Sequence, residues 1–505
     1  MPILSVLRNN QTLRIFAQVG ETVLEALQRA GVRSLEAPCG GNGTCKKCLV
    51  KFNGQKVLAC QTKVTGDCTV EIPEDNRGTV IVNKGHSVNF CLTPAHGLGG
   101  AVDIGTTTVV VHLYDLESGA LLGTKSGINK QRTFGADVIS RIQYANETVN
   151  GLKQLTDTIQ GQVIEYLQQL CSEVGFGIND LNMVTIAANT VMEHIYSGLS
   201  PASIAIAPFT PVSLFGEWEN GNQFGLPEQT KVFLTPAVAG YVGGDITAGV
   251  LSSGAYKASK AVLFLDIGTN GEMAVGNTED GFLCCATAAG PAFEGAAISQ
   301  GMPAAHGAIN QVELIDGKLA VTVLGGGRAR GICGSGLVDA LAVMLELGAV
   351  DETGRLLPAD EAPEAIRPYL DEDDRGTIFR LADEVCITEG DVRQLQLAKA
   401  AIAAGICTLL DEAGISEENV ACLLLAGGFG NYIRKESAVA IGLLPGFMLN
   451  RIISTGNSAG AGAAAVLLSR EAREGLDALC EKCRYIELSG HKGFNDYYIE
   501  NMMFE

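Results

Sequence analysis

Apolar and polar residues alternate along residues 2–18, and this period of two predicts two short strands joined by a turn at Asn9 and Asn10. The next segment, ETVLEALQRAG, has apolar residues at helical spacing and ends in Gly31, a typical helix stop. After a cysteine-containing stretch, VTGDCTVEIPED predicts a closing strand. The N-terminal part of the chain is therefore expected to be a small α+β domain.

From Ala101 onward, glycine-punctuated apolar strands alternate with amphipathic helices, which predicts an α/β fold. The phrase AVDIGTTTVVVHLYD recurs in altered form as LFLDIGTNGEMAVG at 263–276, so we expect an internal duplication. Two such halves would form a cleft between them, where nucleotides bind in folds of this kind. The stretch before this body has the Pro and Gly content of a linker. The expected domains are 1–75, a linker at 76–98, and 99–505.

The chain carries a formal charge of −20, and residues 1–75 account for about +2 of it, with nine Lys and Arg against seven Asp and Glu. Without a basic stripe, this charge excludes nucleic acid as a partner. The longest apolar runs are shorter than the roughly 18 residues that span a membrane, so no membrane insertion is expected. The start MPILSVLRNN lacks the pattern of an export signal, and the 15 cysteines are scattered. We therefore expect a cytoplasmic protein.

Four cysteines near the N-terminus follow the spacing C-x5-C-x2-C-x11-C, which suits a 2Fe-2S cluster. They are Cys39, Cys45, Cys48 and Cys60. The first three lie in a glycine-rich loop, where backbone N–H groups can approach the sulfides closely. Together with the preceding strand, turn, strand and helix, this is the element order of a β-grasp ferredoxin. A structural zinc site is the alternative, because Cys45 and Cys48 alone form a C-x2-C pair.

Three glycine-containing loops in the body predict a nucleotide site. In VDIGTTT, an aspartate ends a strand, a glycine turns the backbone, and three threonines present donors for phosphate oxygens, while the carboxylate can position hydrated Mg²⁺. The second copy repeats this arrangement, and LLLAGGFGNYI offers a side-chain-free surface for adenosine. The candidate residues are Asp103, Gly105, Thr106, Thr107 and Thr108, then Asp266, Gly268, Thr269, Asn270 and Gly271, and finally Gly427, Gly428 and Gly430.

These loops, taken in this order, resemble the motifs of the superfamily of ATPases that contains acetate kinase, sugar kinases, heat-shock chaperones and actin. Residues 103–108 match phosphate 1, AGYVGGDITAG with Asp245 resembles connect 1, and residues 266–272 match phosphate 2. Residues 427–430 match the adenosine motif, and NSAGAGAAAVLL at 457–468 resembles connect 2. The resemblance implies a duplicated actin-like ATPase fold that binds ATP and Mg²⁺.

Within this superfamily the closest resemblance is to the reductive activators of corrinoid proteins. It is carried by the ferredoxin module and by AGPAFEGAAISQGM (289–302), GICGSGLVDAL (331–341) and ITEGDVRQLQLAKAAIAAGI (387–406). The resemblance implies one-electron reduction of inactive Co(II) to Co(I) through the 2Fe-2S cluster, coupled to ATP binding or hydrolysis. It also implies an anaerobic setting, a corrinoid protein of a methyltransferase system as partner, and an upstream low-potential electron donor. A homodimer is left open.

In this hypothesis Asp103 and Asp266 position the magnesium ion and the attacking water. Glu294 is a candidate for ordering that water, although it is equally suited to cap a helix or pair with an arginine. In the segment 187–209, Asn189 and His194 are candidates for contact with a corrin or the partner protein, against the commoner case of a structural histidine. Cys480 and Cys483 form a second C-x2-C pair, which alone cannot complete a metal site.

Three other functions compete with reductive activation. An ATP-dependent electron donor to another low-potential metalloenzyme would use the same modules. A small-molecule kinase would use the ATPase fold but would leave the cysteines unexplained. A zinc-stabilised ATPase scaffold would need no redox chemistry.

Overall fold

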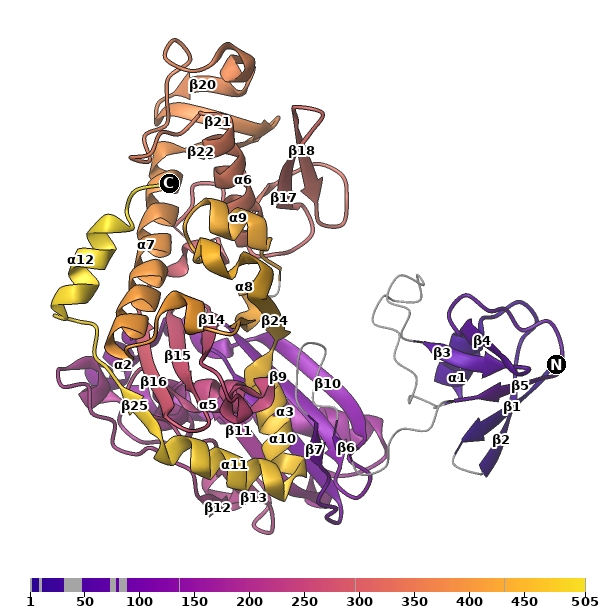
Figure 1. Ribbon diagram of the computed structural model, residues 1–505. Helices are drawn as coiled ribbons and strands as arrows, with labels where there is room; N and C mark the ends of the chain where they lie inside the picture. Colours follow the sequence, from indigo (N-terminus) through magenta and orange to yellow (C-terminus); the bar gives the residue numbers. More distant parts are fainter. Residues whose placement is uncertain are drawn as a thin grey trace. The chain divides into compact units, whose positions relative to one another are not determined.

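The computed structural model describes residues 2–8, 11–30, 48–72, 79–80, 89–135, 137–295, 297–430 and 432–504. The chain divides into two compact units, Met1–Thr79 and Val80–Glu505 (Figure 1). Each unit has a hydrophobic core of its own.

In its described residues, the N-terminal unit has a five-stranded sheet in the order β2-β1-β5-β3-β4 and the helix α1. Strand β1 pairs antiparallel with β2 and parallel with β5, as the alternation along residues 2–18 and the closing strand predicted. Apolar side chains of α1, such as Leu24 and Leu27, are buried against the sheet. The α+β ferredoxin-like unit is confirmed. Its elements are β1 (Ile3–Arg8), β2 (Gln11–Phe16), α1 (Val23–Arg29), β3 (Leu49–Phe52), β4 (Gln55–Leu58) and β5 (Cys68–Glu71).

The first half of the C-terminal unit is built on a six-stranded sheet in the order β10-β9-β8-β11-β13-β12. The strands β8 and β9 form a hairpin, and β8, β11 and β13 run parallel to one another. The elements are β8 (Leu98–Ile104), β9 (Thr108–Asp115), β10 (Leu121–Ile128), α2 (Val138–Glu147), α3 (Gly151–Glu173), β11 (Leu181–Ala188), α4 (Thr190–Tyr196), β12 (Trp218–Asn220), β13 (Lys231–Leu234) and α5 (Gly244–Ser253).

The second half repeats this arrangement in a sheet of order β24-β23-β14-β15-β16-β25. Here β14 and β15 form the hairpin, and β14, β23 and β24 run parallel. The order β10-β9-β8-β11-β13 in the first sheet therefore corresponds to β16-β15-β14-β23-β24 in the second, which confirms the predicted duplication. The elements are β14 (Val262–Ile267), β15 (Gly271–Asn277), β16 (Gly281–Thr287), α7 (Glu389–Glu412), β23 (Leu423–Ala426), α8 (Gly427–Gly430), β24 (Ile452–Gly456) and β25 (Cys483–Tyr485).

The remaining elements surround this frame. In Figure 1 the C-terminal helix α12 (yellow) lies beside α7 (orange), and the two helices are in contact. The stretch ahead of β8 packs on the body through the buried ring of Phe90, which stacks on Tyr256 with 6.3 Å between centroids. The other elements are β6 (Thr79–Val80), β7 (Phe90–Cys91), β17 (Ala308–Ile315), β18 (Lys318–Val323), β19 (Gly331–Ile332), α6 (Gly334–Glu346), β20 (Leu370–Asp373), β21 (Gly376–Ala382), β22 (Val385–Thr388), α9 (Lys435–Ala440), α10 (Ser458–Leu468), α11 (Arg470–Glu481) and α12 (Lys492–Glu500).

Helices α5 and α10 cross at small residues and pack closely. A Cβ on Gly462 of α10 would lie 2.2 Å from the carbonyl oxygen of Ala248 on α5. Since α5 follows the first sheet and α10 follows the second, this crossing joins the two halves.

Among the residues that the structure describes, no helix is long and apolar enough to cross a membrane.

Candidate functional site

The two predicted phosphate loops are equivalent turns of the two sheets. In the first, the N–H of Gly105 donates to the carbonyl oxygen of Thr108 at 2.8 Å; in the second, the N–H of Gly268 donates to that of Asn270 at 2.9 Å. Each loop joins the first and second strands of its half, and each aspartate stands one residue before the strand ends. The turn chemistry read from the sequence therefore forms in both halves.

Three side chains hold the first loop from outside. Asn129 donates to the carbonyl oxygen of Gly105 at 2.9 Å, and the guanidinium of Arg141 donates to that of Thr106 at 2.6 Å. Asn189 donates to the Thr106 hydroxyl at 3.2 Å and also caps α4 by accepting from the N–H of Met192. Asn129 and Arg141 were not among the predicted residues, because their segments resemble ordinary helix starts. A buried arginine on α2 is the signal that only the structure provides.

Glu294 links the two phosphate loops to each other. Its carboxylate accepts from the hydroxyl of Thr107 at 3.1 Å and from that of Thr269 at 2.6 Å. The carboxylate thus bonds one threonine from each half of the duplicated fold. The two alternatives from the sequence, a helix cap and an arginine partner, are not what the described contacts show.

Four carboxyl groups from both halves form a cluster in which burial raises every pKa and the charge of a neighbour raises three of them further. Burial raises the pKa of Asp103 to about 6, against a lowering effect of the hydrogen bond from Asn457. Burial and then repulsion from Asp103 raise the pKa of Asp266 to about 7. For Asp245, burial followed by repulsion from Asp266 and Asp103 raises the pKa to about 8. Burial and the charges of Asp245 and Asp266 hold the pKa of Glu272 well above its ordinary value. Such a cluster favours bound cations or protons.

Two residues beyond the predicted set support this cluster. Asn457, at the start of connect 2, donates to the Asp103 carboxylate at 2.7 Å. Glu193 on α4 is fully buried, and neither of its oxygens has a hydrogen-bond partner of ordinary geometry among the described residues. Burial, followed by repulsion from Asp245, raises the pKa of Glu193 well above its usual range. Burial and the charge of Asp245 therefore both favour the protonated form of Glu193.

The glycines of the predicted adenosine motif differ in what they do. A Cβ on Gly427, which has φ +86°, would lie 2.4 Å from Oδ1 of Asp266, so this motif touches phosphate 2. Gly428 is exposed, and a Cβ added to it would have no atom within 4 Å, which leaves room for a flat base. A Cβ added to Gly430 would instead lie 2.9 Å from Cγ of Leu425. A Cβ added to Gly271 of phosphate 2 would lie 2.0 Å from Cδ1 of Ile402. Neighbouring side chains therefore occupy the space beside these last two glycines.

Within the described ranges, no group of three or more His, Cys, Asp or Glu side chains is arranged to hold a metal ion. The carboxyl cluster therefore does not form an all-protein cage. It fits Mg²⁺ that keeps its water ligands and arrives with nucleotide phosphates, which is how this ion is usually bound.

Two of the four predicted cluster ligands lie in the described part of the N-terminal unit. Cys48 directly precedes β3 and Cys60 follows β4, and the two strands pair antiparallel with Leu49 opposite Leu58. Both thiols are buried and contact each other, and burial together with the neighbouring thiol raises the pKa of Cys48. Paired, buried thiols of this kind fit a cluster ligated by cysteine. Cys39 and Cys45 lie outside the described residues.

The secondary candidates have structural roles. His194 is buried; its Nδ1 bonds the carbonyl oxygen of Thr190 at 2.7 Å, and its Nε2 accepts from the N–H groups of Val212 and Ser213. Both ring nitrogens are engaged, so the ordinary structural histidine accounts for it. Cys480 and Cys483 are partly buried, and the Cys483 thiol hydrogen-bonds that of Cys284 on β16.

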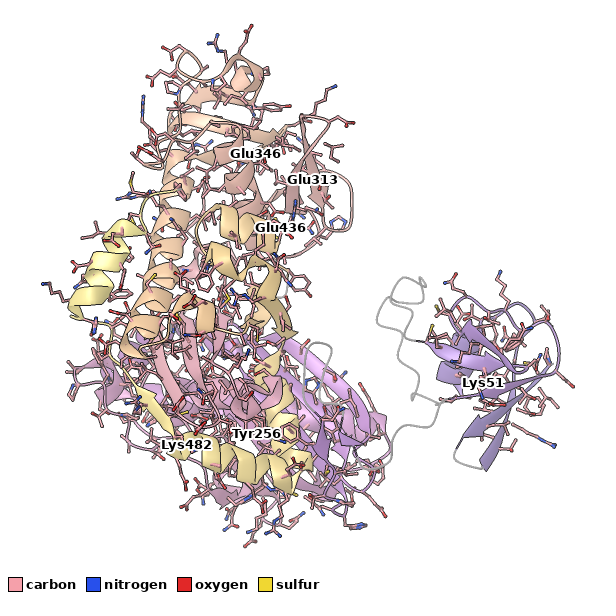
Figure 2. The ribbon with its side chains drawn as sticks, viewed as in Figure 1. Lys51, Tyr256, Glu313, Glu346, Glu436 and Lys482 are labelled. Carbon is pink, nitrogen blue, oxygen red and sulfur yellow. The ribbon has the colours of Figure 1, made fainter. Side chains whose placement is uncertain are left out.

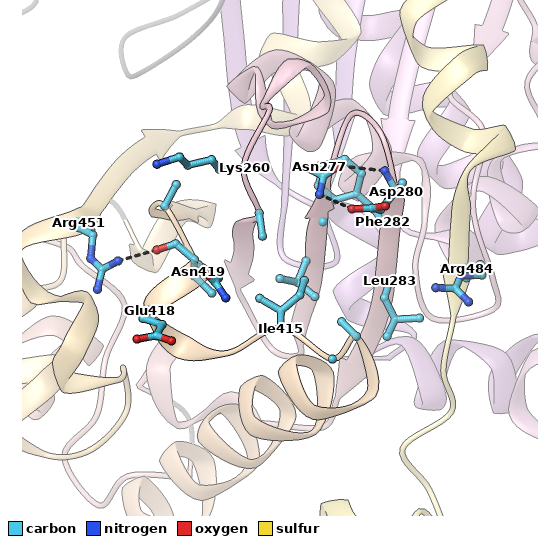
Figure 3. A pocket seen from close by; sticks show the side chains of 18 residues that line it. Lys260, Asn277, Asp280, Phe282, Leu283, Ile415, Glu418, Asn419, Arg451 and Arg484 are labelled. Carbon is cyan, nitrogen blue, oxygen red and sulfur yellow. Dashed lines mark hydrogen bonds between the residues drawn. The ribbon is translucent and has the colours of Figure 1, made fainter.

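A pocket of about 860 Å³ lies at the opposite end of the strands from the phosphate loops (Figure 3). It is lined by residues that start β14 and β16 and end β15, including Lys260 and Asn277. Asn277 donates to Asp280 at 2.7 Å, and Arg451 donates to the carbonyl oxygen of Val420 at 2.6 Å. The pocket therefore contains none of the phosphate-loop residues.

Known protein families match three successive parts of the chain. Residues 7–65 match the family of the 2Fe-2S iron-sulfur cluster binding domain. Residues 98–258 match the RACo middle region, and residues 260–505 match the C-terminal domain of RACo, the ASKHA domain.

Two relatives and one solved structure are similar over most of their length. The corrinoid activation enzyme RamQ of Eubacterium limosum is 33% identical, covering 93% of this chain and 94% of that protein. The [Co(II) methylated amine-specific corrinoid protein] reductase of Methanosarcina barkeri is 24% identical, covering 79% and 76%. The structure of a reductive activator for corrinoid, iron-sulfur protein is 31% identical with a TM-score of 0.72, covering 100% of this chain and 98% of that one.

Proposed function

Because the chain belongs to the family of reductive activators of corrinoid proteins, we propose that it returns an inactive Co(II) corrinoid protein to Co(I) at the expense of ATP. The match at 33% identity over nearly the full length of a corrinoid activation enzyme carries this proposal. Both relatives are named for action on corrinoid proteins, which supports such a protein of a methyltransferase system as the partner.

In the N-terminal unit, Cys39, Cys45, Cys48 and Cys60 hold the 2Fe-2S cluster. The cluster, when bound, supplies a one-electron carrier. The protein's part is to keep the ligand thiols of Cys48 and Cys60 out of water, since both are buried in the core of this unit. An upstream low-potential donor and a homodimer remain parts of the proposal that only partner-binding experiments test.

In the C-terminal unit, the threonines of the two loops donate to the phosphates of ATP. Asp103 and Asp266 orient the water ligands of Mg²⁺, and Asn457 keeps the Asp103 carboxylate in place through its hydrogen bond of 2.7 Å. Asp245 extends the acidic surface at the start of α5. Gly428 leaves its surface free for the adenine ring. Glu294, between the loops, orders the attacking water once phosphate is bound.

The competing functions leave part of the chain unexplained. A small-molecule kinase and a zinc-stabilised scaffold do not account for the match of residues 7–65 to a 2Fe-2S domain. An electron donor to a different metalloenzyme does not account for two relatives whose names describe action on corrinoid proteins, one of which aligns over 93% of this chain.

The test is performed under strict anoxia with the full chain. Chemically reduced protein is mixed with a candidate Co(II) corrinoid protein, with and without MgATP, and the Co(I) absorption band is followed. Formation of Co(I) only with MgATP is the expected result. If no corrinoid protein is reduced although the cluster is reducible and ATP binds, the electron-donor alternative replaces this proposal.

A further inference from the structure

Thr107 and Thr269 direct their hydroxyl protons to one carboxylate, that of Glu294. In the proposed function these same hydroxyls donate to phosphate oxygens. A carboxylate and a phosphate are both anionic acceptors with strong, short hydrogen bonds. Glu294 therefore occupies the position of an internal anion between the loops.

We propose that Glu294 is a positioning residue that bridges the two phosphate loops until the phosphates of MgATP displace its carboxylate. This inference rests on the proposed ATP site and deepens it. The bridge fixes the two halves relative to each other through their most similar turns. Its release leaves the threonine hydroxyls free for phosphate and the carboxylate free to order water.

The segment that carries Glu294 suits a carboxylate that changes position. Glu294 ends the short helix Pro291–Glu294, which follows Gly290 at φ +80°. No atom lies within 4 Å of a Cβ built on Gly290, so there is open space at the start of this helix, four residues before Glu294. Glu294 itself is half-buried, unlike a core residue that packing would lock.

The same helix connects the bridge to the adenosine motif. The ring of Phe293 stacks on that of Phe429, with 4.7 Å between centroids. In the chain, Phe429 lies between Gly427, which is next to Asp266, and Gly430, which is next to Leu425. A displacement of Glu294 by phosphate therefore acts on the residues that we expect to contact the base, so the bridge links both ends of the nucleotide.

Binding of the non-hydrolysable analogue MgAMPPNP to the full chain tests this. Two hydrogen bonds to a charged acceptor favour the bridged form, and the apparent affinity for nucleotide is proportional to the fraction of protein in which the bridge is open. We expect roughly tenfold tighter binding for Glu294→Ala, and about threefold for Glu294→Gln, which keeps one acceptor oxygen. Hydrolysis of ATP falls in both variants, which separates binding from turnover.

Glu346→Gln is the matched control, since it removes the same charge at the exposed far end of α6, where Figure 2 labels it. It should bind MgAMPPNP as the unchanged protein does. If Glu294→Ala and Glu294→Gln bind no more tightly than this control, the bridge does not compete with phosphate. Failure of the unchanged protein to bind MgAMPPNP would instead remove the proposed ATP site itself.

A charge effect without a bridge is distinguished by hydrogen–deuterium exchange of the nucleotide-free protein. Glu294→Ala, which lacks the bridge, should exchange faster in the loop segments 105–108 and 268–271. The control Glu346→Gln should exchange at the rate of the unchanged protein in both segments. Tighter binding with unchanged exchange in both loops would overturn the bridge and leave only repulsion between the carboxylate and phosphate.

Discussion

Replacing Gly462 by alanine should separate the two helices that join the halves of the ATPase unit. A Cβ at this position would lie 2.2 Å from the carbonyl oxygen, 2.5 Å from the carbonyl carbon and 2.6 Å from the Cβ of Ala248. Two of these atoms belong to the backbone, so no side chain can turn aside. Ordinary contact begins at 3.4 Å, so α5 and α10 must move apart by about 1 Å.

The cost can be compared with a matched glycine. Overpacking of this kind costs about 3 kcal/mol, and alanine regains about 1 kcal/mol of helix propensity, so we expect a net loss of about 2 kcal/mol for Gly462→Ala. Gly161, in the interior of α3, has no atom within 4 Å of its Cβ position. Gly161→Ala should therefore stabilise the unit by about 0.5–1 kcal/mol.

Urea denaturation followed by tryptophan fluorescence measures the difference in unfolding free energy between these variants in the C-terminal unit. The sequence has one tryptophan, Trp218, and it lies on β12 of the C-terminal unit. Gly462→Ala should also weaken MgATP binding, because α5 carries Asp245 and α10 follows Asn457. Equal midpoints for Gly462→Ala and the unchanged protein, with Gly161→Ala behaving as expected, would refute the close crossing.

Four further predictions concern the two sites. Asp266→Asn should abolish ATP-dependent formation of Co(I) and leave the visible spectrum of the cluster intact. Cys45→Ser should remove the cluster spectrum, with iron and sulfide analysis as its measure, while MgATP still binds. The ATP-dependent rate should rise with pH between about 6 and 8. Burial raises the pKa of Asp103 to about 6 and that of Asp266 to about 7, and both carboxyl groups must lose their protons to orient the ligands of Mg²⁺. Asn457→Ala removes a hydrogen bond that lowers the pKa of Asp103, so the rise should move to higher pH.

The outcomes that would contradict these predictions are distinct. Loss of the cluster in Asp266→Asn would mean that the two units do not act as separate modules. Retention of iron and sulfide in Cys45→Ser would remove this residue from the ligand set. A rate that falls as pH rises from 6 to 8, at constant cluster content, would contradict the need for ionised carboxylates.

The raised carboxyl pKa values also determine whether the stability of the nucleotide-free protein rises or falls with pH. A carboxyl whose pKa is higher in the folded chain binds its proton more tightly there than in the unfolded chain. Its contribution to stability is present below the unfolded pKa, near 4, and is lost as the pH rises through about 8, the pKa of Asp245. Urea midpoints without MgATP should therefore decrease over this range.

The sequence predicted the parts of the site that are local in the chain. Each phosphate loop is a turn between paired strands, so an aspartate, a glycine and nearby hydroxyls within six residues suffice to define it. The bond between Thr107 and Glu294 spans 187 positions, and no local pattern specifies such a pair. Arg141 was missed for the same reason, because its partner is a backbone carbonyl group 35 positions away.

Some residues were assigned to nucleotide binding by type although packing explains them. Gly271 is needed where Ile402 of α7 crosses β15, and Gly430 where Leu425 packs beneath the adenosine motif. A glycine in a motif does not reveal whether a ligand or a neighbouring helix takes the space. The duplication, by contrast, was predictable because both halves repeat a phrase whose strand pairing is fixed by the same hairpin.

The hairpin of β3 and β4 bears on how the N-terminal unit acquires its iron. Cys48 and Cys60 stand at the two open ends of that hairpin, so a short local loop closure brings them together. Local closures of this kind are among the fastest events in folding. Of the four cysteines proposed as ligands, two are therefore brought together by the fold of the chain itself. In the proposed site, an incoming cluster would meet this pair of thiols already in place, and the chain would have only the other two ligands to supply.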